Sequence, residues 1–280
     1  MNKIKVYAFA DEASAVIDNQ IKAMKENGVD GLEIRNVDNV NVSEISDSKA
    51  KEVKKKMDEA QLKVWSIGSP IGKIDIEKGD FALHLEKFKR TIEIAGILQA
   101  ENIRLFSFFT PEETRSEYKN EVIERLGKFL DIAKGSGIDI CHENEKGIYG
   151  DIPERCLEIH KALPEMKAIF DPANYVQCGV DTLKGWEMLK GYVKYLHIKD
   201  ALAGGSVVPA GTGIGNVKHI LDSFIENNGN VVTIEPHLTV FDGLSELENE
   251  DNKSVVGSVY RYPSNEAAFA AAVASFRELL

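Results

Sequence analysis

Short apolar segments alternate with amphipathic stretches along the whole chain, and this alternation constrains the fold more than any other feature. We predict eight strands, at residues 4–9, 31–35, 62–67, 103–109, 138–143, 167–171, 194–199 and 231–235. Between them, apolar side chains recur three and four residues apart, as on one face of a helix, for example in 85–95 and 122–133. A last helix is predicted at 265–280. Strands that alternate with helices in this way predict βαβ units and a parallel sheet.

Eight such units in 280 residues match the size of a (β/α)8 TIM barrel, which we predict as a single α/β domain spanning 1–280. An open, doubly wound sheet is the alternative. It usually carries a glycine-rich phosphate turn after its first strand, and the segment AFADEASA at 8–15 is not one. The acidic segment 245–254 is predicted to be a surface excursion.

The charge of the chain disfavours nucleic acid as a partner. The formal net charge is -11, and such a field repels a phosphate backbone unless a local basic patch opposes it. The lysines at 49–56 are mixed with acidic residues, which is typical of the solvated face of a helix. We therefore predict no nucleic-acid partner.

The lack of a recognisable targeting signal and the pattern of cysteines predict a cytoplasmic location. The apolar stretch at the N-terminus is too short for a signal peptide, and no apolar run is long enough to cross a bilayer, so no membrane partner is expected. Cys141, Cys156 and Cys178 are odd in number and form no CxxC pair, which fits a reducing compartment. The sequence leaves the subunit count open, a homo-oligomer included.

Four ionisable side chains stand where the last four predicted strands end. They are Glu143, Asp171, His197 and Glu235. The carboxyl ends of barrel strands meet on one rim, so these side chains are expected to converge there. One such residue alone is more often a helix cap, a surface acid or a hydrogen-bonded core histidine. Together, in apolar segments, their buried charge requires a compensating cation, so we predict a site for one divalent metal ion.

The ligand types restrict the ion and suggest a use for it. An oxygen-rich site with one imidazole suits Mn²⁺ or Mg²⁺ and tolerates Co²⁺ or Zn²⁺, and Mn²⁺ is our first choice. A cation that holds a carbonyl and its neighbouring hydroxyl favours loss of the intervening C–H proton as an enediolate. With Glu143 and Glu235 as acid and base on opposite sides of that carbon, the outcome is epimerisation or aldose–ketose isomerisation.

Further polar residues near these strand ends are candidates for contact with a substrate. Lys73 follows the third predicted strand, and Lys199 lies two residues beyond His197. Glu145 shares the inward side with Glu143 and is a substrate contact or an alternative ligand. Asn144 is predicted to orient the site.

Two other features leave their roles open. The segment AGTGIGN at 210–216 precedes a helix predicted to begin near Val217, and it is either a tight turn or a phosphate-binding loop. His237 is either a partner of the metal ligands or a rim residue. His142 is predicted to point away from the barrel axis.

The segments that contain the four strand-end residues resemble a known family. HENEKGIYGD, FDPANYVQCG, HIKDA and IEPHL together resemble the sugar phosphate isomerase/epimerase family with a xylose isomerase-like TIM barrel. This family includes ketose 3-epimerases, inosose dehydratases and endonucleases of the endonuclease IV type, and the resemblance covers essentially the whole chain. It implies that Glu143, Asp171, His197 and Glu235 bind one Mn²⁺-like ion, with the two Glu residues as acid–base pair.

One position departs from the family pattern. Asn174 stands where the ketose epimerases have a histidine that touches substrate and the endonucleases have a histidine that binds metal. An amide still hydrogen-bonds a substrate hydroxyl, whereas a trinuclear zinc cluster loses a ligand. We therefore predict a metal-dependent isomerase or epimerase of carbohydrate metabolism that acts on a small keto-sugar or polyol-like substrate. The alternatives are a dehydratase of a keto-polyol such as an inosose, a hydrolase of abasic DNA and a non-catalytic sugar-binding barrel.

Overall fold

Eight parallel strands form a closed barrel in the computed structural model, which describes residues 4–242, 244 and 255–280. The strands are β1 (Lys5–Ala8), β2 (Gly31–Ile34), β5 (Lys63–Ile67), β6 (Asn102–Leu105), β7 (Asp139–Glu143), β8 (Lys167–Phe170), β9 (Val193–Ile198) and β12 (Val231–Ile234). Their positions confirm the eight predicted strands, and the closed ring excludes the open sheet. The predicted acidic excursion at 245–254 lies outside the described residues.

The barrel closes because the first and last strands pair with each other. β1 runs parallel to β12, with Tyr7 opposite Thr233, and it also pairs with β2 on its other side. The loop after β1 therefore lies beside the loop after β12. Residues more than two hundred positions apart in the sequence meet at this seam.

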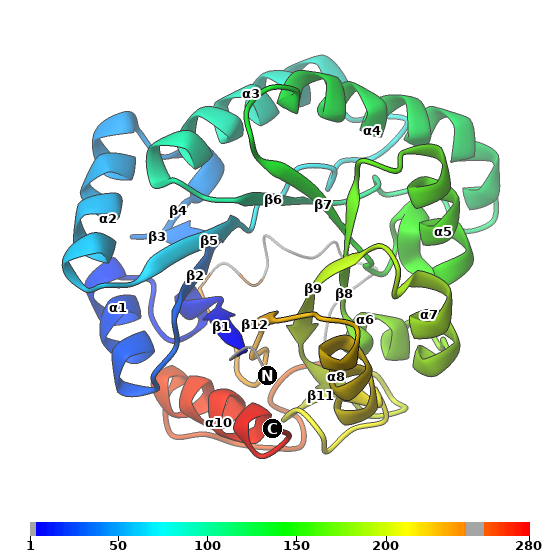
Figure 1. Cartoon of the computed structure of the whole chain (residues 1–280). Coiled ribbons are helices and arrows are strands. Elements are labelled where there is room, and N and C mark those ends of the chain that lie inside the picture. The colour runs from blue at the N-terminus through cyan, green and yellow to red at the C-terminus, as the bar shows by residue number, and fades with distance from the viewer. Residues whose placement is uncertain (1–3, 243, 245–254) are drawn as a thin grey trace.

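Helices surround the strands as an outer ring (Figure 1). They are α1 (Ile17–Glu26), α2 (Asp47–Glu59), α3 (Phe81–Leu98), α4 (Lys119–Ala133), α5 (Pro153–Ala162), α6 (Pro172–Gln177), α7 (Thr182–Leu189), α8 (Val217–Glu226) and α10 (Asn265–Arg277). The apolar face predicted at 122–133 is buried against the barrel on α4. No helix among the described residues has both the length and the apolar character needed to span a membrane.

The fourth strand is shorter than predicted. It ends at Leu105, and the backbone beyond it hydrogen-bonds a rim loop instead of the next strand: Phe106 N–H donates to the Ile71 carbonyl, and Phe108 N–H donates to the Gly72 carbonyl. Gly72 has φ +87°, and a Cβ there would lie 1.9 Å from the Phe106 carbonyl oxygen, so only glycine fits. This loop carries Lys73, which is thereby fixed at the barrel mouth.

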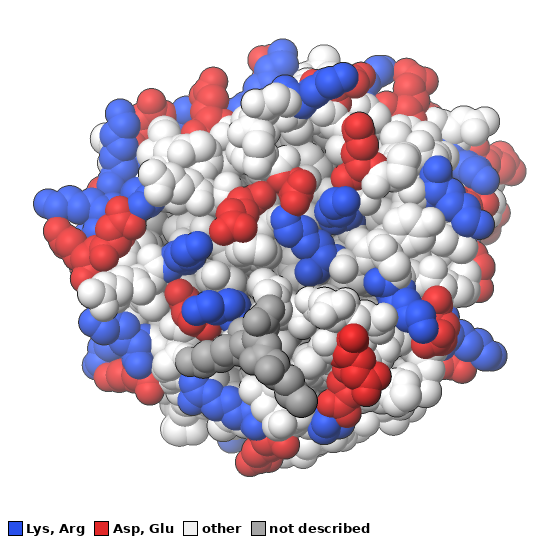
Figure 2. Space-filling view, viewed as in Figure 1, with Lys and Arg blue, Asp and Glu red and all other residues white. Residues whose placement is uncertain are grey.

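Charged side chains of both signs are interspersed over the face seen in Figure 2. On α2, the predicted solvated lysine face is confirmed by ion pairs within the helix, such as Lys49 with Glu52 at 3.0 Å and Lys56 with Glu52 at 3.3 Å. On the solvated face of α2, lysine side chains are thus accompanied by acidic ones.

Candidate metal centre and active site

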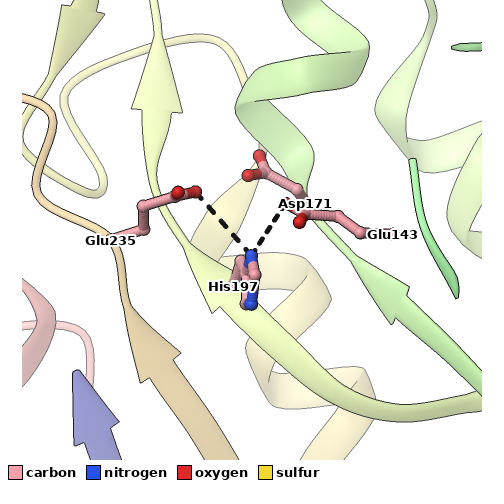
Figure 3. Close-up of side chains that lie close together, drawn as sticks. All are labelled: Glu143, Asp171, His197 and Glu235. Carbon is pink, nitrogen blue, oxygen red and sulfur yellow. Dashed lines mark hydrogen bonds and ion pairs between the residues drawn. The ribbon is translucent and has the colours of Figure 1, made fainter. Parts of the chain in front are cut away.

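Four side chains from consecutive barrel strands meet inside the barrel mouth. Glu143 ends β7, Asp171 follows β8, His197 lies in β9 and Glu235 follows β12. One ligand atom from each lies within 4.8 Å of the others, and all four residues are buried. Glu143 and Glu235 approach from opposite sides of His197 (Figure 3). The structure therefore brings together the four residues that the sequence singled out.

The Asp171 carboxylate accepts a backbone N–H of the following helix, and the Asp171 backbone is hydrogen-bonded by the Asn144 side chain. Its φ of -108° and ψ of 107° place it as the cap of α6, where one carboxylate oxygen accepts the N–H of Asn174 at 2.9 Å. Pro172 begins the helix, a position that suits its fixed φ. The Asn144 side chain both accepts from the Asp171 N–H and donates to the Asp171 carbonyl, each at 2.9 Å. Asn144 therefore fixes the backbone of Asp171.

His197 lies between three carboxylates. Its Nδ1 is 2.9 Å from Glu143 Oε1 and 3.7 Å from Glu235 Oε2. Its Nε2 is 3.1 Å from Glu33 Oε2. Burial alone would lower the pKa of His197, but the Glu143 and Glu33 carboxylates outweigh it and raise the pKa to about 10. Without a metal ion, the imidazole is therefore held as a cation.

Lys199 bridges two of the candidate ligands. Its Nζ lies 2.9 Å from Asp171 Oδ2 and 2.7 Å from Glu235 Oε2. Burial opposes ionisation of all three groups. The pair of carboxylates nevertheless raises the pKa of Lys199 well above its usual value, and Lys199 lowers the pKa of Glu235. For Asp171, burial prevails and raises the pKa. Lys199 thus partly neutralises these two carboxylates.

Two arginines hold the outer oxygens of the two glutamates. Arg104, from β6, contacts Glu143 Oε2 at 3.1 Å, and Arg35, which follows β2, lies 3.5 Å from Glu235 Oε1. With these oxygens engaged, Glu143 Oε1 and Glu235 Oε2 are the ones that face His197. Arg35 also binds Asp11 at 2.8 Å. Sequence analysis did not assign these pairs, although charged residues at the ends of apolar strands were a visible signal.

The donor set fits a divalent cation. The three carboxylates are hard ligands of the kind that Mg²⁺ and Mn²⁺ accept, and the one imidazole is a borderline ligand that transition-metal ions accept. Among the described residues of the barrel mouth, buried carboxylates outnumber buried Lys and Arg side chains. The carboxylates are Asp11, Glu12, Glu33, Glu143, Asp171 and Glu235, and the cations are Arg35, Arg104 and Lys199. A bound cation would reduce this excess of negative charge.

Comparison with known proteins identifies the family. A family model described as a xylose isomerase-like TIM barrel matches residues 21–252 of the chain. The chain belongs to this family. No curated protein sequence matches it significantly.

Solved structures share the xylose isomerase-like fold over nearly the whole chain. The IolI protein with a bound zinc atom has a TM-score of 0.75 at 15% identity, covering 99% of this chain and 98% of IolI. D-psicose 3-epimerase from Clostridium cellulolyticum H10, with D-tagatose, has a TM-score of 0.73 at 14% identity, covering 99% of each chain. The probable 3-DHS dehydratase AsbF from Bacillus anthracis has a TM-score of 0.70 at 15% identity, covering 98% of each chain. At these identities the likeness shows the fold.

Three more predicted residues surround the four central ones in this xylose isomerase-like barrel. Lys73 Nζ lies 3.2 Å from Glu145 Oε2 and 4.4 Å from the centre of the Phe106 ring. Burial would raise the pKa of Glu145, but Lys73 and other nearby lysines lower it to about 2. Among the described residues, Glu145 does not join the group that could hold an ion with Glu143. Asn174 donates to the Asn144 carbonyl at 2.9 Å and approaches Glu143 Oε1 at 3.4 Å.

The glycine-rich segment at 210–216 is occupied by a side chain of the protein itself. The Asp200 carboxylate accepts the N–H groups of Gly211, Gly213 and Gly215 at 3.0, 3.0 and 2.8 Å. These amides would have formed the predicted phosphate site, so the phosphate alternative is wrong and the tight turn is correct. The helix predicted after it is α8, which begins at Val217.

Two histidines left open by the sequence have definite neighbours. His237 contacts the cluster that could hold an ion: its Nδ1 lies 3.0 Å from Glu12 Oε1 and 3.7 Å from Glu235 Oε1. His142 points away from the barrel axis, as predicted, because its ring packs on His160 of α5 with ring centres 5.9 Å apart. His237 is therefore a partner of the ligands, whereas His142 is a packing residue.

Proposed function

We propose that this chain is a divalent-metal-dependent isomerase or epimerase of a small keto-sugar or polyol-like substrate. One observation carries the proposal: Glu143 and Glu235 face each other across a buried group of Asp171 and His197 that could hold an ion. The family includes solved epimerases of the same fold, which supports the reaction class. Mn²⁺ is the ion we propose first, since the donor set is rich in carboxylate oxygen.

The proposed chemistry divides between the ion and the two glutamates. A bound divalent ion would polarise the carbonyl and hydroxyl oxygens of the substrate and favour the enediolate. Glu143 takes the proton from the carbon between them. Glu235, which takes up a proton from Lys199 at 2.7 Å, returns a proton from the opposite side, which gives an epimer. Return to the neighbouring carbon gives the isomer. Arg104 and Arg35 hold the outer oxygens of the two glutamates, so that the inner oxygens stay aimed at the reacting carbon.

We assign the surrounding polar residues to the substrate. Asn174, Lys199, Lys73 and Glu145 supply amide, ammonium and carboxylate groups that hydrogen-bond the hydroxyls of a sugar. Asn144 acts through Asp171, because its side-chain amide accepts from the Asp171 N–H and donates to the Asp171 carbonyl. The substrate hydroxyls that these residues contact define the specificity of the site.

Replacement of the proposed base tests this function. Glu143→Gln preserves the shape of the side chain but cannot accept a proton. Exchange of the substrate C–H proton with deuterated solvent, followed by NMR over a panel of keto-sugars with added Mn²⁺, should slow by at least about 100-fold relative to wild type. Glu26→Gln, on the exposed end of α1, is the matched control and should exchange like wild type. Full exchange in Glu143→Gln would remove Glu143 from the mechanism.

A dehydratase is the second candidate, because Lys199 places a buried proton donor 2.7 Å from Glu235. After one carboxylate removes the proton next to the carbonyl, the neighbouring hydroxyl can leave as water with a proton from Lys199, and a C=C bond conjugated to the carbonyl remains. A solved structure of the same fold is described as a probable 3-DHS dehydratase. Growth of enone absorbance with keto-polyol substrates would favour this candidate, and its absence alongside C–H exchange would favour the epimerase.

A further inference from the structure

Glu33 is a buried carboxylate inside the barrel that the proposed proton transfer does not use. It lies on β2, has no exposed surface and is not a member of the four-residue ion cluster. Burying a carboxylate costs free energy unless hydrogen bonds or an opposite charge compensate it. The contacts of its two oxygens therefore indicate what it does.

The two oxygens of Glu33 have different partners. Oε1 accepts from the Tyr195 hydroxyl at 2.9 Å and from Ser66 Oγ at 3.3 Å. Oε2 lies 3.1 Å from Nε2 of His197. Tyr195 and Ser66 thus fix the carboxylate from one side, and its other oxygen faces the imidazole. Glu33 reaches His197 from the side opposite the ion cluster.

This contact decides which nitrogen of His197 carries hydrogen. An ionised carboxylate only accepts hydrogen bonds, so Nε2 must be the donor toward Glu33. The other nitrogen, Nδ1, faces Glu143 and Glu235 at 2.9 and 3.7 Å. In the tautomer that has its hydrogen on Nε2, the donor to Glu33, Nδ1 carries the lone pair. The lone pair then points into the ion cluster.

We propose that Glu33 is a positioning residue that holds His197 in the Nε2–H tautomer, with Nδ1 as the ligand atom for a divalent ion. The inference rests on the proposed metal site. Histidine ligands commonly donate their second N–H to a carboxylate, which fixes the ring and strengthens the ligand nitrogen. Glu33 thus acts on the ion through His197 and touches neither ion nor substrate.

Metal affinity in chelator-treated protein tests the inference first. Zn²⁺ and Mn²⁺ are titrated by calorimetry into wild type, Glu33→Leu and Glu33→Gln. Glu33→Leu removes the acceptor, and its affinity should fall about 10- to 100-fold. Glu33→Gln keeps an amide oxygen that can accept from Nε2, so it should recover part of the loss. Tyr195→Phe removes one donor to Glu33 Oε1 but leaves Ser66 and the acceptor of Nε2 in place, so its affinity should fall less than that of Glu33→Leu.

NMR of protein labelled with ¹⁵N in the histidine rings reads the tautomer directly. The His197 signals are assigned by their absence in His197→Asn. In Zn²⁺-loaded wild type, Nε2 should carry the proton and Nδ1 should show the shift of a metal-bound nitrogen. Glu33→Leu should show a mixture of tautomers or a loss of the Nδ1 shift. Tyr195→Phe and Glu33→Gln should keep the Nε2–H tautomer, because both retain an acceptor for Nε2, and the wild-type spectrum itself tests the Nδ1 assignment if Glu33→Leu does not fold.

The outcomes separate this inference from the proposed function. If wild type binds no divalent ion, the metal site itself is wrong. If wild type binds and Glu33→Leu binds equally with an unchanged His197 tautomer, only the role of Glu33 is wrong. Equal losses in Glu33→Leu and Tyr195→Phe would also overturn the role, because they would reflect general damage to the pocket.

Discussion

Lys199 illustrates how one residue can set the charge of the site. Its ammonium lies between Asp171 and Glu235, two of the groups that would hold an ion. Among the described residues, its Nζ contacts both Asp171 Oδ2, at 2.9 Å, and Glu235 Oε2, at 2.7 Å. A bound ion and Lys199 would therefore share the task of neutralising these carboxylates. This sharing makes the stability of the ion-free protein depend on Lys199.

Lys199→Met should destabilise the ion-free protein, because it leaves two buried carboxylates without their cation. We expect a loss of about 3–5 kcal/mol in the free energy of unfolding, the usual cost of removing one partner from a buried ion pair. Added Mn²⁺ should restore part of the loss, since the ion supplies the missing charge. Urea unfolding after chelator treatment, with and without Mn²⁺, measures both effects.

Lys128→Met is the control for this experiment, because Lys128 lies on α4 with its side chain 48% exposed and forms an ion pair with the exposed Glu124. Exposed pairs contribute about 0–1 kcal/mol. Equal stability of Lys199→Met and Lys128→Met without Mn²⁺ would show that Lys199 does not neutralise the site.

At the scale of elements, helix α3 supports the rim loop that carries Lys73. Nε2 of His84, on α3, accepts the N–H of Gly72 at 2.7 Å. Burial, with a smaller contribution from Lys87, lowers the pKa of His84 from 6.5 to about 4. The neutral imidazole is thus the form that holds the loop. Protonation would leave Gly72 N–H without its acceptor.

This pairing predicts a pH dependence of stability. Because the pKa of His84 is lower in the folded state, the unfolded chain binds a proton first as the pH falls below 6.5, and stability is lost between 6.5 and about 4. The contribution of His84 reaches about 1.4 kcal/mol per pH unit. His84→Gln does not titrate, so wild type should lose more stability than this variant between about pH 7 and about pH 5. Urea unfolding at both pH values measures the difference.

The exposed His219 on α8 provides the comparison for His84. His219→Gln should follow the pH dependence of wild type, because the His219 side chain is exposed and hydrogen-bonds none of the described residues. If His84→Gln and wild type lose stability in parallel as the pH falls, His84 does not hold the loop through its neutral form.

The barrel strands and the residues at their ends could be predicted from the sequence, but the side chains that these residues contact could not. Glu143 and Glu235 were identifiable because each ends an apolar strand, and parallel strands end at one rim. Glu33 was equally visible as a charge within the strand GLEI. Its contact with His197 depends on which side chains cross the barrel interior. The same holds for Asp200, whose carboxylate fills the glycine loop that the sequence pattern left open.

At the scale of the whole molecule, barrel closure assembles the site. The pairing of β1 with β12 brings Glu12 next to His237, two residues separated by almost the entire chain. Arg35 reaches Glu235 across the same seam. Local sequence patterns carry no signal for such pairs, because they arise only when the ring closes. That the chain forms one domain over 1–280, and that it is cytoplasmic, stay predictions.

The central claim is that Glu143, Asp171, His197 and Glu235 bind one divalent ion. A crystal structure of the protein grown with Mn²⁺, with anomalous diffraction recorded at the manganese edge, tests it most directly. The account predicts one strong anomalous peak per chain, in contact with all four side chains and on the Nδ1 side of His197. A map without a peak at this position, or with a peak that these residues do not contact, would contradict it.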